Sequence, residues 1–171
     1  MTVERLAALI GERQPCVVLT GAGVSTESGV PDFRSPTGIW AKVDPLEYGS
    51  LQAFRDDPEK VWRFYAPRFS MLTEAAPNDA HRALAELERR GYVRAVVTQN
   101  IDLLHERAGS ADVVEVHGSI RTSSCPGCGA TYPLAEVLSL LDATAVPRCA
   151  RCGAVLKPDV VFFGENVPRE R

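Results

Sequence analysis

The sequence predicts an α/β fold in which a parallel, doubly wound sheet carries a small inserted metal-binding domain. Short apolar runs at residues 16–20, 93–98 and 113–116 have the length and valine content of buried strands. Amphipathic helical patterns separate these runs, and strands that alternate with helices form parallel sheets. Residues 121–155 then change to a cysteine-containing stretch without a long apolar segment, and the strand pattern returns at 160–163. The simplest interpretation is an insertion within the α/β domain.

Composition and charge are those of an ordinary globular domain with room for one small insertion. Of the 171 residues, 45% are hydrophobic and 24% are charged, and the formal net charge is −3. This charge creates no positive field that attracts nucleic acid or an anionic membrane, so neither partner is expected. The N-terminal residues lack the pattern of a secretory signal, and no apolar run approaches the ~20 residues that cross a bilayer. We therefore expect a cytoplasmic location.

Capping residues predict where the first two helices begin. Thr2 can cap a helix that ends at Gly11. Asp57 and Pro58 can begin a second helix as its N-cap and first residue, and Pro67 is expected to kink or end it.

A third helix is predicted between Asn78, as its N-cap, and Gly91. Its inward-facing residues are expected to be Ala80, Ala83, Leu84 and Leu87. Residues 30–57 are rich in proline and glycine and are predicted to form a long loop with little regular structure, which in a compact domain is usually a binding loop. Residues 168–171 look like the first turn of a helix whose body is absent, so the sheet lacks the strands that would follow.

Glycine and polar residues follow each of the three predicted strands. Residues 21–23 (Gly-Ala-Gly) follow the first strand, residues 98–102 (Thr-Gln-Asn-Ile-Asp) end the second, and His117 follows the third. Ligands of open α/β sheets bind beyond the carboxyl ends of the strands, where these segments should meet. Each segment also has a structural explanation: a tight turn, a helix cap and a structural histidine. The glycine turn is weak as a cofactor motif on its own, because Thr26 stands where a third glycine would be.

These residue types suit a nucleotide site with acid–base chemistry. Glycines allow the backbone to approach a pyrophosphate, and amides at the start of a helix donate to anions. The Asp102 carboxylate can accept from a carboxamide, and the Asn100 side chain can both donate and accept. His117 is a candidate general base, because imidazole exchanges protons near neutral pH. His81 and His105 lie within helical patterns and are expected to be structural.

Four cysteines give the strongest single motif. Cys125-x-x-Cys128 and Cys149-x-x-Cys152 are separated by twenty residues, and two such pairs form a closed tetrahedral zinc site. Four protein ligands leave no open position, so the zinc should be structural rather than catalytic. A redox dithiol would need one reactive pair instead of two matched ones. The fifth cysteine, Cys16, lies in an apolar run and is expected to be a small core residue.

Together these segments resemble the sirtuin family. The matching stretches are residues 21–34, 98–105, 115–118, the four cysteines and residues 157–165, in the family's order and over nearly the whole chain. The resemblance implies a Rossmann-like NAD-binding domain. We assign residues 1–120 and 156–171 to it, and residues 121–155 to the zinc-binding small domain.

The resemblance also implies a reaction. Sirtuins consume NAD as a co-substrate: the acyl oxygen of a modified lysine attacks C1′ of the nicotinamide ribose, and nicotinamide leaves. The acyl group ends on ADP-ribose. The chain is thus expected to be an NAD-dependent protein-lysine deacylase that contains a structural Zn²⁺ and acts on acyl-lysine proteins.

Roles for single residues follow from the same resemblance. His117 would be the catalytic base that activates a ribose hydroxyl, and Phe33 would shield the reactive face from water. The residues expected to bind NAD are Gly21, Ala22, Gly23, Ser25, Thr26, Asp32, Phe33, Arg34, Gln99, Asn100, Ile101 and Asp102, of which the last three would form the nicotinamide pocket. The residues expected to line the acyl-lysine tunnel and pair with the substrate peptide as an added strand are Val161, Phe162, Gly164 and Glu165.

The preferred acyl group is left open between two alternatives. Tyr65 and Arg68 are three residues apart on one helix, and a phenol beside a guanidinium could bind a carboxylate. The pair resembles the Tyr-x-x-Arg of sirtuins that remove succinyl and malonyl groups. The alternative is a core aromatic residue beside an arginine whose stem packs on apolar surface, with acetyl removal as the activity.

The chain departs from the family after residue 165. Sirtuins continue with further strands and helices, which carry a Gly-Thr-Ser turn and an asparagine that hold the adenosine half of NAD. We therefore expect this chain alone to bind NAD poorly and to expose an unpaired sheet edge. The competing hypotheses are ADP-ribosyl transfer to another acceptor, a non-catalytic zinc-ribbon interaction module, and an inactive truncated fragment.

Overall fold

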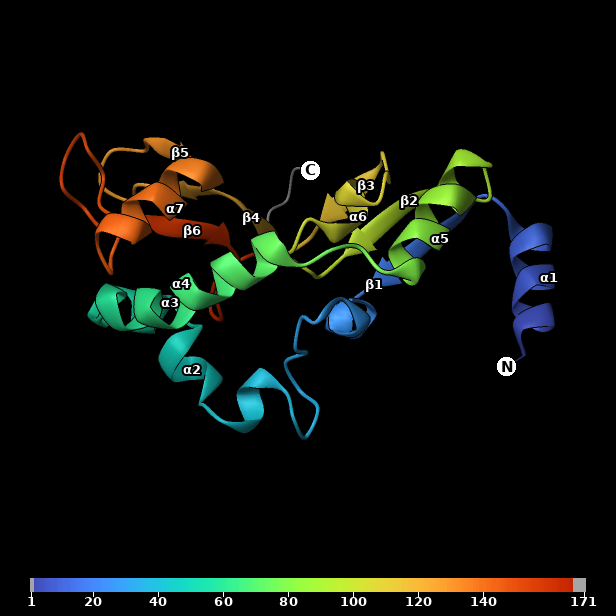
Figure 1. Cartoon of the computed structure of the whole chain (residues 1–171), viewed down its shortest axis with the longest axis horizontal. Helices are drawn as coiled ribbons and strands as arrows, with labels where there is room; N and C mark the ends of the chain where they lie inside the picture. Colours follow the sequence, from blue (N-terminus) through green and yellow to red (C-terminus); the bar gives the residue numbers. More distant parts are fainter. Residues whose placement is uncertain (1, 168–171) are drawn as a thin grey trace.

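The computed structural model describes residues 2–167. The helix start predicted at residues 168–171 lies outside them. The elements in chain order are α1 (Val3–Arg13), β1 (Cys16–Thr20), η1 (Ala22–Ser28), η2 (Ile39–Ala41), α2 (Pro45–Tyr48), α3 (Leu51–Asp56), α4 (Pro58–Glu74), α5 (Asp79–Arg89), β2 (Val93–Thr98), α6 (Leu104–Arg107), β3 (Val113–Glu115), β4 (Gly118–Ser124), β5 (Thr131–Pro133), α7 (Leu134–Ala143) and β6 (Lys157–Val160). The chain forms two separate three-stranded sheets, and α4 runs beside the second sheet toward the first (Figure 1).

The predicted parallel sheet is confirmed, with the strand order β1-β2-β3 and both pairs parallel. α5 packs on β2 and crosses one face of the sheet, where Val96 is fully buried. The opposite face is open at β1, because the Val17 and Leu19 side chains are 62% and 68% exposed. Among residues 2–167, β1 pairs with β2 alone, so its other edge carries no strand.

The cysteine-containing segment belongs to the second sheet, which is antiparallel in the order β5-β4-β6. The strand predicted at 160–163 is wrong in its bounds, because pairing with β4 ends at Val160. The chain then turns, and Phe163 forms an isolated bridge with Ser50 in front of α3. The predicted domain ranges stay a prediction.

The main hydrophobic core lies between α4 and the second sheet. Trp62 and Phe69 of α4 are fully buried and pack edge to face, with ring centroids 5.6 Å apart. The Trp62 indole N–H donates to the Leu156 carbonyl at 2.6 Å, which ties α4 to the segment before β6. Further buried residues of this core come from the second sheet, α7 and the segments that flank them; they include Ile120, Cys125, Tyr132, Val137, Cys149, Leu156, Val160 and Phe162.

Two predictions about the segment between β1 and α5 need correction. Residues 30–57 are not an irregular loop, because α2 and α3 form within them. The side chains of Asp44 and Ser50 accept from the amides of Leu46 and Ala53 and so cap these short helices. α4 begins after its Asp57 cap as predicted. Of the two alternatives predicted for Pro67, the helix end is wrong, because α4 continues through Pro67 to Glu74, and the kink stays a prediction.

Two further helix predictions were partly wrong. α1 is capped by Thr2 but runs through Gly11 to Arg13, and none of its residues is buried. α5 begins after Asn78 as predicted, yet Ala80 and Ala83 are exposed while His81 is buried. Among residues 2–167, no helix combines the length and the apolar character required to cross a bilayer.

Candidate functional site

The carboxyl ends of the three parallel strands are joined by short hydrogen bonds. The Thr20 hydroxyl at the end of β1 donates to the Thr98 hydroxyl at the end of β2 over 2.8 Å. The Thr98 carbonyl accepts from the Val116 amide at 2.9 Å, and the Gln99 amide donates to the Thr20 carbonyl at 3.0 Å. The segments predicted to follow the strands therefore meet at one edge of the sheet.

The glycine turn leads directly from β1 into the 3-10 helix η1. Gly21 precedes the first residue of η1, and the Thr26 hydroxyl donates to the Gly23 carbonyl at 3.0 Å. A Cβ placed on Gly23 would meet no heavy atom within 4 Å, whereas one on Gly21 would lie 3.5 Å from the Gln99 side chain. Packing within the chain does not require glycine at position 23, so the open space there fits a ligand that approaches the backbone.

A buried cluster of Ser25, Asn100 and Asp102 lies beside this turn. The Ser25 hydroxyl donates to Asp102 Oδ2 at 2.7 Å and accepts from the Asn100 side-chain amide at 3.1 Å. The other carboxylate oxygen of Asp102 accepts from the Leu104 amide at the start of α6 at 3.0 Å. Asp102 thus holds the first amide of α6 and also forms part of the cluster.

Two buried histidines lie beside this cluster, and one of them, His81, contacts it. His81 Nε2 lies 3.4 Å from the Ser25 hydroxyl, and His105 Nε2 lies 2.9 Å from the Thr20 hydroxyl. The two imidazole rings are in contact, with centroids 4.8 Å apart. Burial lowers the pKa of both histidines, and the neighbouring His81 lowers that of His105 further. Both side chains are therefore held neutral within the fold at neutral pH.

His117 lies at the same edge of the sheet as the glycine turn. Its Nδ1 lies 3.1 Å from the Gln99 carbonyl oxygen, which can only accept. Nδ1 is therefore the donor of this hydrogen bond, and Nε2 is the ring nitrogen that remains for a ligand. Gly118 follows with φ +71°, and a Cβ there would lie 2.0 Å from the Asp159 carbonyl oxygen, so only glycine allows β4 to pair with β6 at this point.

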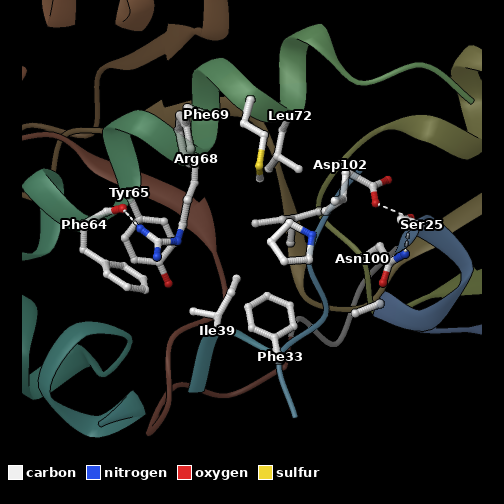
Figure 2. A pocket seen from close by; sticks show the side chains of 15 residues that line it. Ser25, Phe33, Ile39, Phe64, Tyr65, Arg68, Phe69, Leu72, Asn100 and Asp102 are labelled. Carbon is white, nitrogen blue, oxygen red and sulfur yellow. Dashed lines mark hydrogen bonds between the residues drawn. The ribbon is translucent and has the colours of Figure 1, made fainter. Parts of the chain in front are cut away.

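One cavity connects the buried cluster to α4, with an empty volume of about 570 Å³ that includes space open to solvent. Figure 2 shows Ser25, Asn100 and Asp102 at one end, and Tyr65 and Arg68 at the other. The walls between the two ends are mostly apolar and come from Ala22, Val30, Pro31, Phe33, Ile39, Phe64, Phe69, Met71, Leu72 and Ile101.

Phe33 is placed in this wall by a tight loop. The Asp32 carboxylate accepts from the Ser35 amide at 3.0 Å, and a Cβ on Gly38 would lie 2.5 Å from that carboxylate. The Phe33 ring stacks on Trp40 with centroids 5.5 Å apart and remains 37% exposed. Asp32 thus shapes the loop, while Arg34, also expected to bind NAD, lies exposed beside it.

Tyr65 and Arg68 project from α4 into the far end of the cavity (Figure 2). The Arg68 guanidinium donates to the Phe64 carbonyl and lies over the Phe64 ring, 3.5 Å from its centroid. The Tyr65 ring stacks on Phe162 with centroids 5.5 Å apart. Burial raises the pKa of Tyr65, and the charge of Glu165 raises it further, while burial lowers the pKa of Arg68. The phenol is therefore a neutral donor beside a cation.

The four cysteines form a compact thiol cluster. Their sulfur atoms all lie within 4.8 Å of one another, and the pairs Cys125–Cys152 and Cys128–Cys149 are 3.4 and 3.5 Å apart. Four thiolates at Zn–S distances of ~2.3 Å would lie roughly 3.8 Å apart in a tetrahedron, so the donor set fits a structural zinc ion. The Tyr132 hydroxyl donates to Cys149 Sγ at 3.2 Å and lowers the pKa of that thiol to about 6.

Sequence reasoning missed several walls of the cavity. Ile39, Phe64, Met71 and Leu72 line it but come from segments predicted only as a loop or a helix. The sequence shows that these residues are apolar, but no motif around any of them indicates that its side chain faces a cavity. Cys16, expected in the core, is only half-buried.

Comparison with known proteins gives a consistent result. The profile of the Sir2 family matches residues 21–171. Similar relatives include the NAD-dependent protein deacetylase 1 of Pyrobaculum aerophilum, 47% identical over 168 residues, and the NAD-dependent protein deacylase 1 of Archaeoglobus fulgidus, 48% identical over 165 residues. These alignments cover 98% and 96% of this chain but 65% and 66% of the relatives, so the chain spans just under two thirds of their length.

Solved structures agree. A Sir2 homologue mutant in complex with ADP-ribose is 45% identical with a TM-score of 0.86, covering 98% of this chain and 66% of that one. A Sir2 mutant with a deacetylated p53 peptide and 3′-O-acetyl ADP-ribose is 41% identical with a TM-score of 0.92, covering 98% of this chain and 68% of that one.

Proposed function

Because the chain belongs to the Sir2 family, we propose that it carries the nicotinamide-side half of the active site of an NAD-dependent protein-lysine deacylase. The observation that supports this most directly is the joining of His117, the glycine turn and the Ser25–Asn100–Asp102 cluster at one edge of the sheet. The relatives named as NAD-dependent deacetylases and deacylases support the same activity.

We assign the two ends of the cavity to the two substrates. NAD bound at the strand ends would supply a ribose carbon from which nicotinamide can leave. The residues proposed to hold it are Gly21, Ala22, Gly23, Ser25, Thr26, Arg34, Gln99, Asn100, Ile101 and Asp102, with Asp32 shaping the loop that presents Phe33. The polar cluster would orient the carboxamide, and the Phe33 ring would exclude water.

His117 is the proposed base for a ribose hydroxyl. Its Nδ1–H is already donated to a backbone carbonyl, so the free Nε2 can accept the proton without a change of tautomer. The acyl-lysine would reach this point through the far end of the cavity, beside Tyr65 and Phe162. Positioning of the acyl oxygen would then supply much of the rate acceleration, because an amide oxygen is a weak nucleophile.

An acidic acyl group is the proposed preference, with acetyl removal retained as a second activity. The Arg68 guanidinium and Tyr65 hydroxyl lie together in a mostly apolar cavity, where a phenol and a cation can bind one carboxylate. In the free chain Arg68 is held by the Phe64 ring and carbonyl, contacts that a succinyl or malonyl carboxylate would have to replace.

The test is mass spectrometry of acetyl-, malonyl- and succinyl-lysine peptides incubated with the chain and millimolar NAD. We expect NAD-dependent loss of the acyl group, and a loss of rate of about 100-fold or more in His117→Ala. Arg68→Met should slow removal of the acidic acyl groups more than removal of acetyl. Nicotinamide release that is independent of any acyl peptide would instead favour ADP-ribosyl transfer. If peptides and NAD remain unchanged and acyl-lysine peptides do not bind, the deacylase proposal fails for this chain.

A further inference from the structure

The segment that follows β6 is held by an ion pair that no step of the proposed reaction uses. Lys157 Nζ lies 3.0 Å from Glu165 Oε2, and the two side chains are only 18% and 22% exposed. The Lys157 ammonium also lies 4.4 Å from the centroid of the Phe162 ring. A pair this shielded is screened less by solvent than the surface ion pairs of the same chain.

Both partners bind the backbone of this segment. Lys157 Nζ donates to the carbonyls of Pro158 and Val160 at 3.1 and 3.0 Å. Glu165 Oε2 accepts from the Phe162 amide at 2.7 Å, and the Glu165 amide donates back to the Phe162 carbonyl at 3.0 Å. The ion pair therefore closes residues 157–165 into a turn that its own backbone groups hold in one shape.

This turn contacts both the proposed base, His117, and the end of the cavity beside Tyr65. The Val161 amide donates to the His117 carbonyl at 2.8 Å, next to the proposed base. The Phe163 amide donates to the Gly49 carbonyl at 2.8 Å, and the Phe162 ring stacks on Tyr65 in the wall of the cavity. Within residues 2–167, the Gly164 amide and carbonyl make no hydrogen bond with the chain and remain available to a strand-like peptide.

From these contacts we infer that Lys157 and Glu165 are positioning residues that hold the 161–165 segment ready to receive the acyl-lysine peptide. The inference rests on the proposed function for the identity of the peptide, but the shape of the turn stands on its contacts alone. Because the segment is already ordered, peptide binding does not have to bear the entropy cost of ordering it. The affinity for the peptide is higher for that reason.

The experiment compares Lys157→Met with a matched control. The Lys60–Glu47 pair has the same 3.0 Å separation, and its ammonium lies 4.6 Å from the centroid of the Tyr48 ring. Lys60→Met therefore removes a similar ion pair and ring contact, but at a more exposed position outside the 161–165 segment. Both variants of the full chain, and Lys157→Arg as the conservative rescue, are measured in two assays. The first is amide hydrogen exchange by NMR, and the second is binding of acetyl-lysine, succinyl-lysine and unmodified peptides by fluorescence anisotropy.

We expect Lys157→Met to speed exchange of the Phe162 amide about 10-fold, because its carboxylate acceptor is no longer held in place. Acetyl-lysine peptide affinity should fall by about 5- to 20-fold. Lys60→Met should change neither the exchange rate of the Phe162 amide nor the peptide affinity. Lys157→Arg should retain most of the amide protection and most of the affinity.

The inference is overturned if exchange at Phe162 is unchanged in Lys157→Met, if exchange rises equally throughout the chain, or if Lys60→Met has the same effects. Failure of the unaltered chain to prefer either acyl-lysine peptide over the unmodified one would count against the proposed function instead. The exchange measurement would still decide whether the ion pair holds the turn.

Discussion

Removing the Tyr132 hydroxyl tests whether the cysteine cluster binds zinc and whether a hydrogen bond to one of its sulfur atoms strengthens that binding. The hydroxyl donates to Cys149 Sγ at 3.2 Å and accepts from the Ala150 amide at 2.8 Å, and the side chain is only 6% exposed. Hydrogen bonds to charged groups contribute roughly 1.5–3 kcal/mol. Tyr132→Phe keeps the ring but removes the hydroxyl, so zinc affinity should fall by about 10- to 100-fold, as for other residues that bind metal ligands.

Zinc affinity is measured by competition with a chromophoric chelator at fixed pH. Tyr48→Phe is the control, because Tyr48 packs on Phe64 in a different part of the molecule. A Tyr132→Phe chain that binds zinc within twofold of the unaltered chain would refute the argument, since the hydroxyl would then contribute nothing to the thiolate. Absence of zinc from the unaltered chain would refute the metal site itself.

Three further predictions use different measurements. Gly118→Ala should lower the free energy of unfolding by at least about 2 kcal/mol in urea titrations, because a Cβ there meets the Asp159 carbonyl at 2.0 Å in a left-handed conformation; a smaller change would mean that β4 and β6 separate at little cost. Leu19→Lys should leave the melting temperature unchanged in thermal unfolding, because Leu19 is 68% exposed on the open face of the sheet, and a large loss of stability would show that this face is packed. Acidification should destabilise the chain: burial lowers the pKa of His81 and His105, so the unfolded chain binds more protons once the pH falls below about 6.5. Stability should then decline by up to about 1.4 kcal/mol per pH unit for each histidine, and His105→Gln should have a shallower pH dependence of melting temperature; an equal slope would exclude His105 as a source.

Most of the sheet and the helix starts could be predicted, because the signals are local. The apolar run of β1 and the caps at Asp57 and Asn78 depend on a few consecutive residues, and the structure agrees with them. The four cysteines were equally clear, since their spacing alone indicates a common ligand. Their clustering is confirmed by sulfur atoms that lie within 4.8 Å of one another.

The incorrect predictions arose where long-range packing outweighs local pattern. The caps of α2 and α3, Asp44 and Ser50, were overlooked because prolines and glycines dominate their surroundings. In α5, spacing placed alanines inward, but His81 is buried instead, where its ring faces His105 and Ser25. The cavity could not be predicted at all, because its walls bring α4 together with η1 and the loop around Phe33.

The contacts of His117 also determine which substitutions can disturb it. Its ring proton goes to the carbonyl of Gln99, and its own carbonyl accepts from the amide of Val161. Both partners are main-chain atoms, so replacing either neighbouring side chain leaves the tautomer and the anchor in place. The side chains at these two positions can therefore change without removing the hydrogen bonds that orient the imidazole.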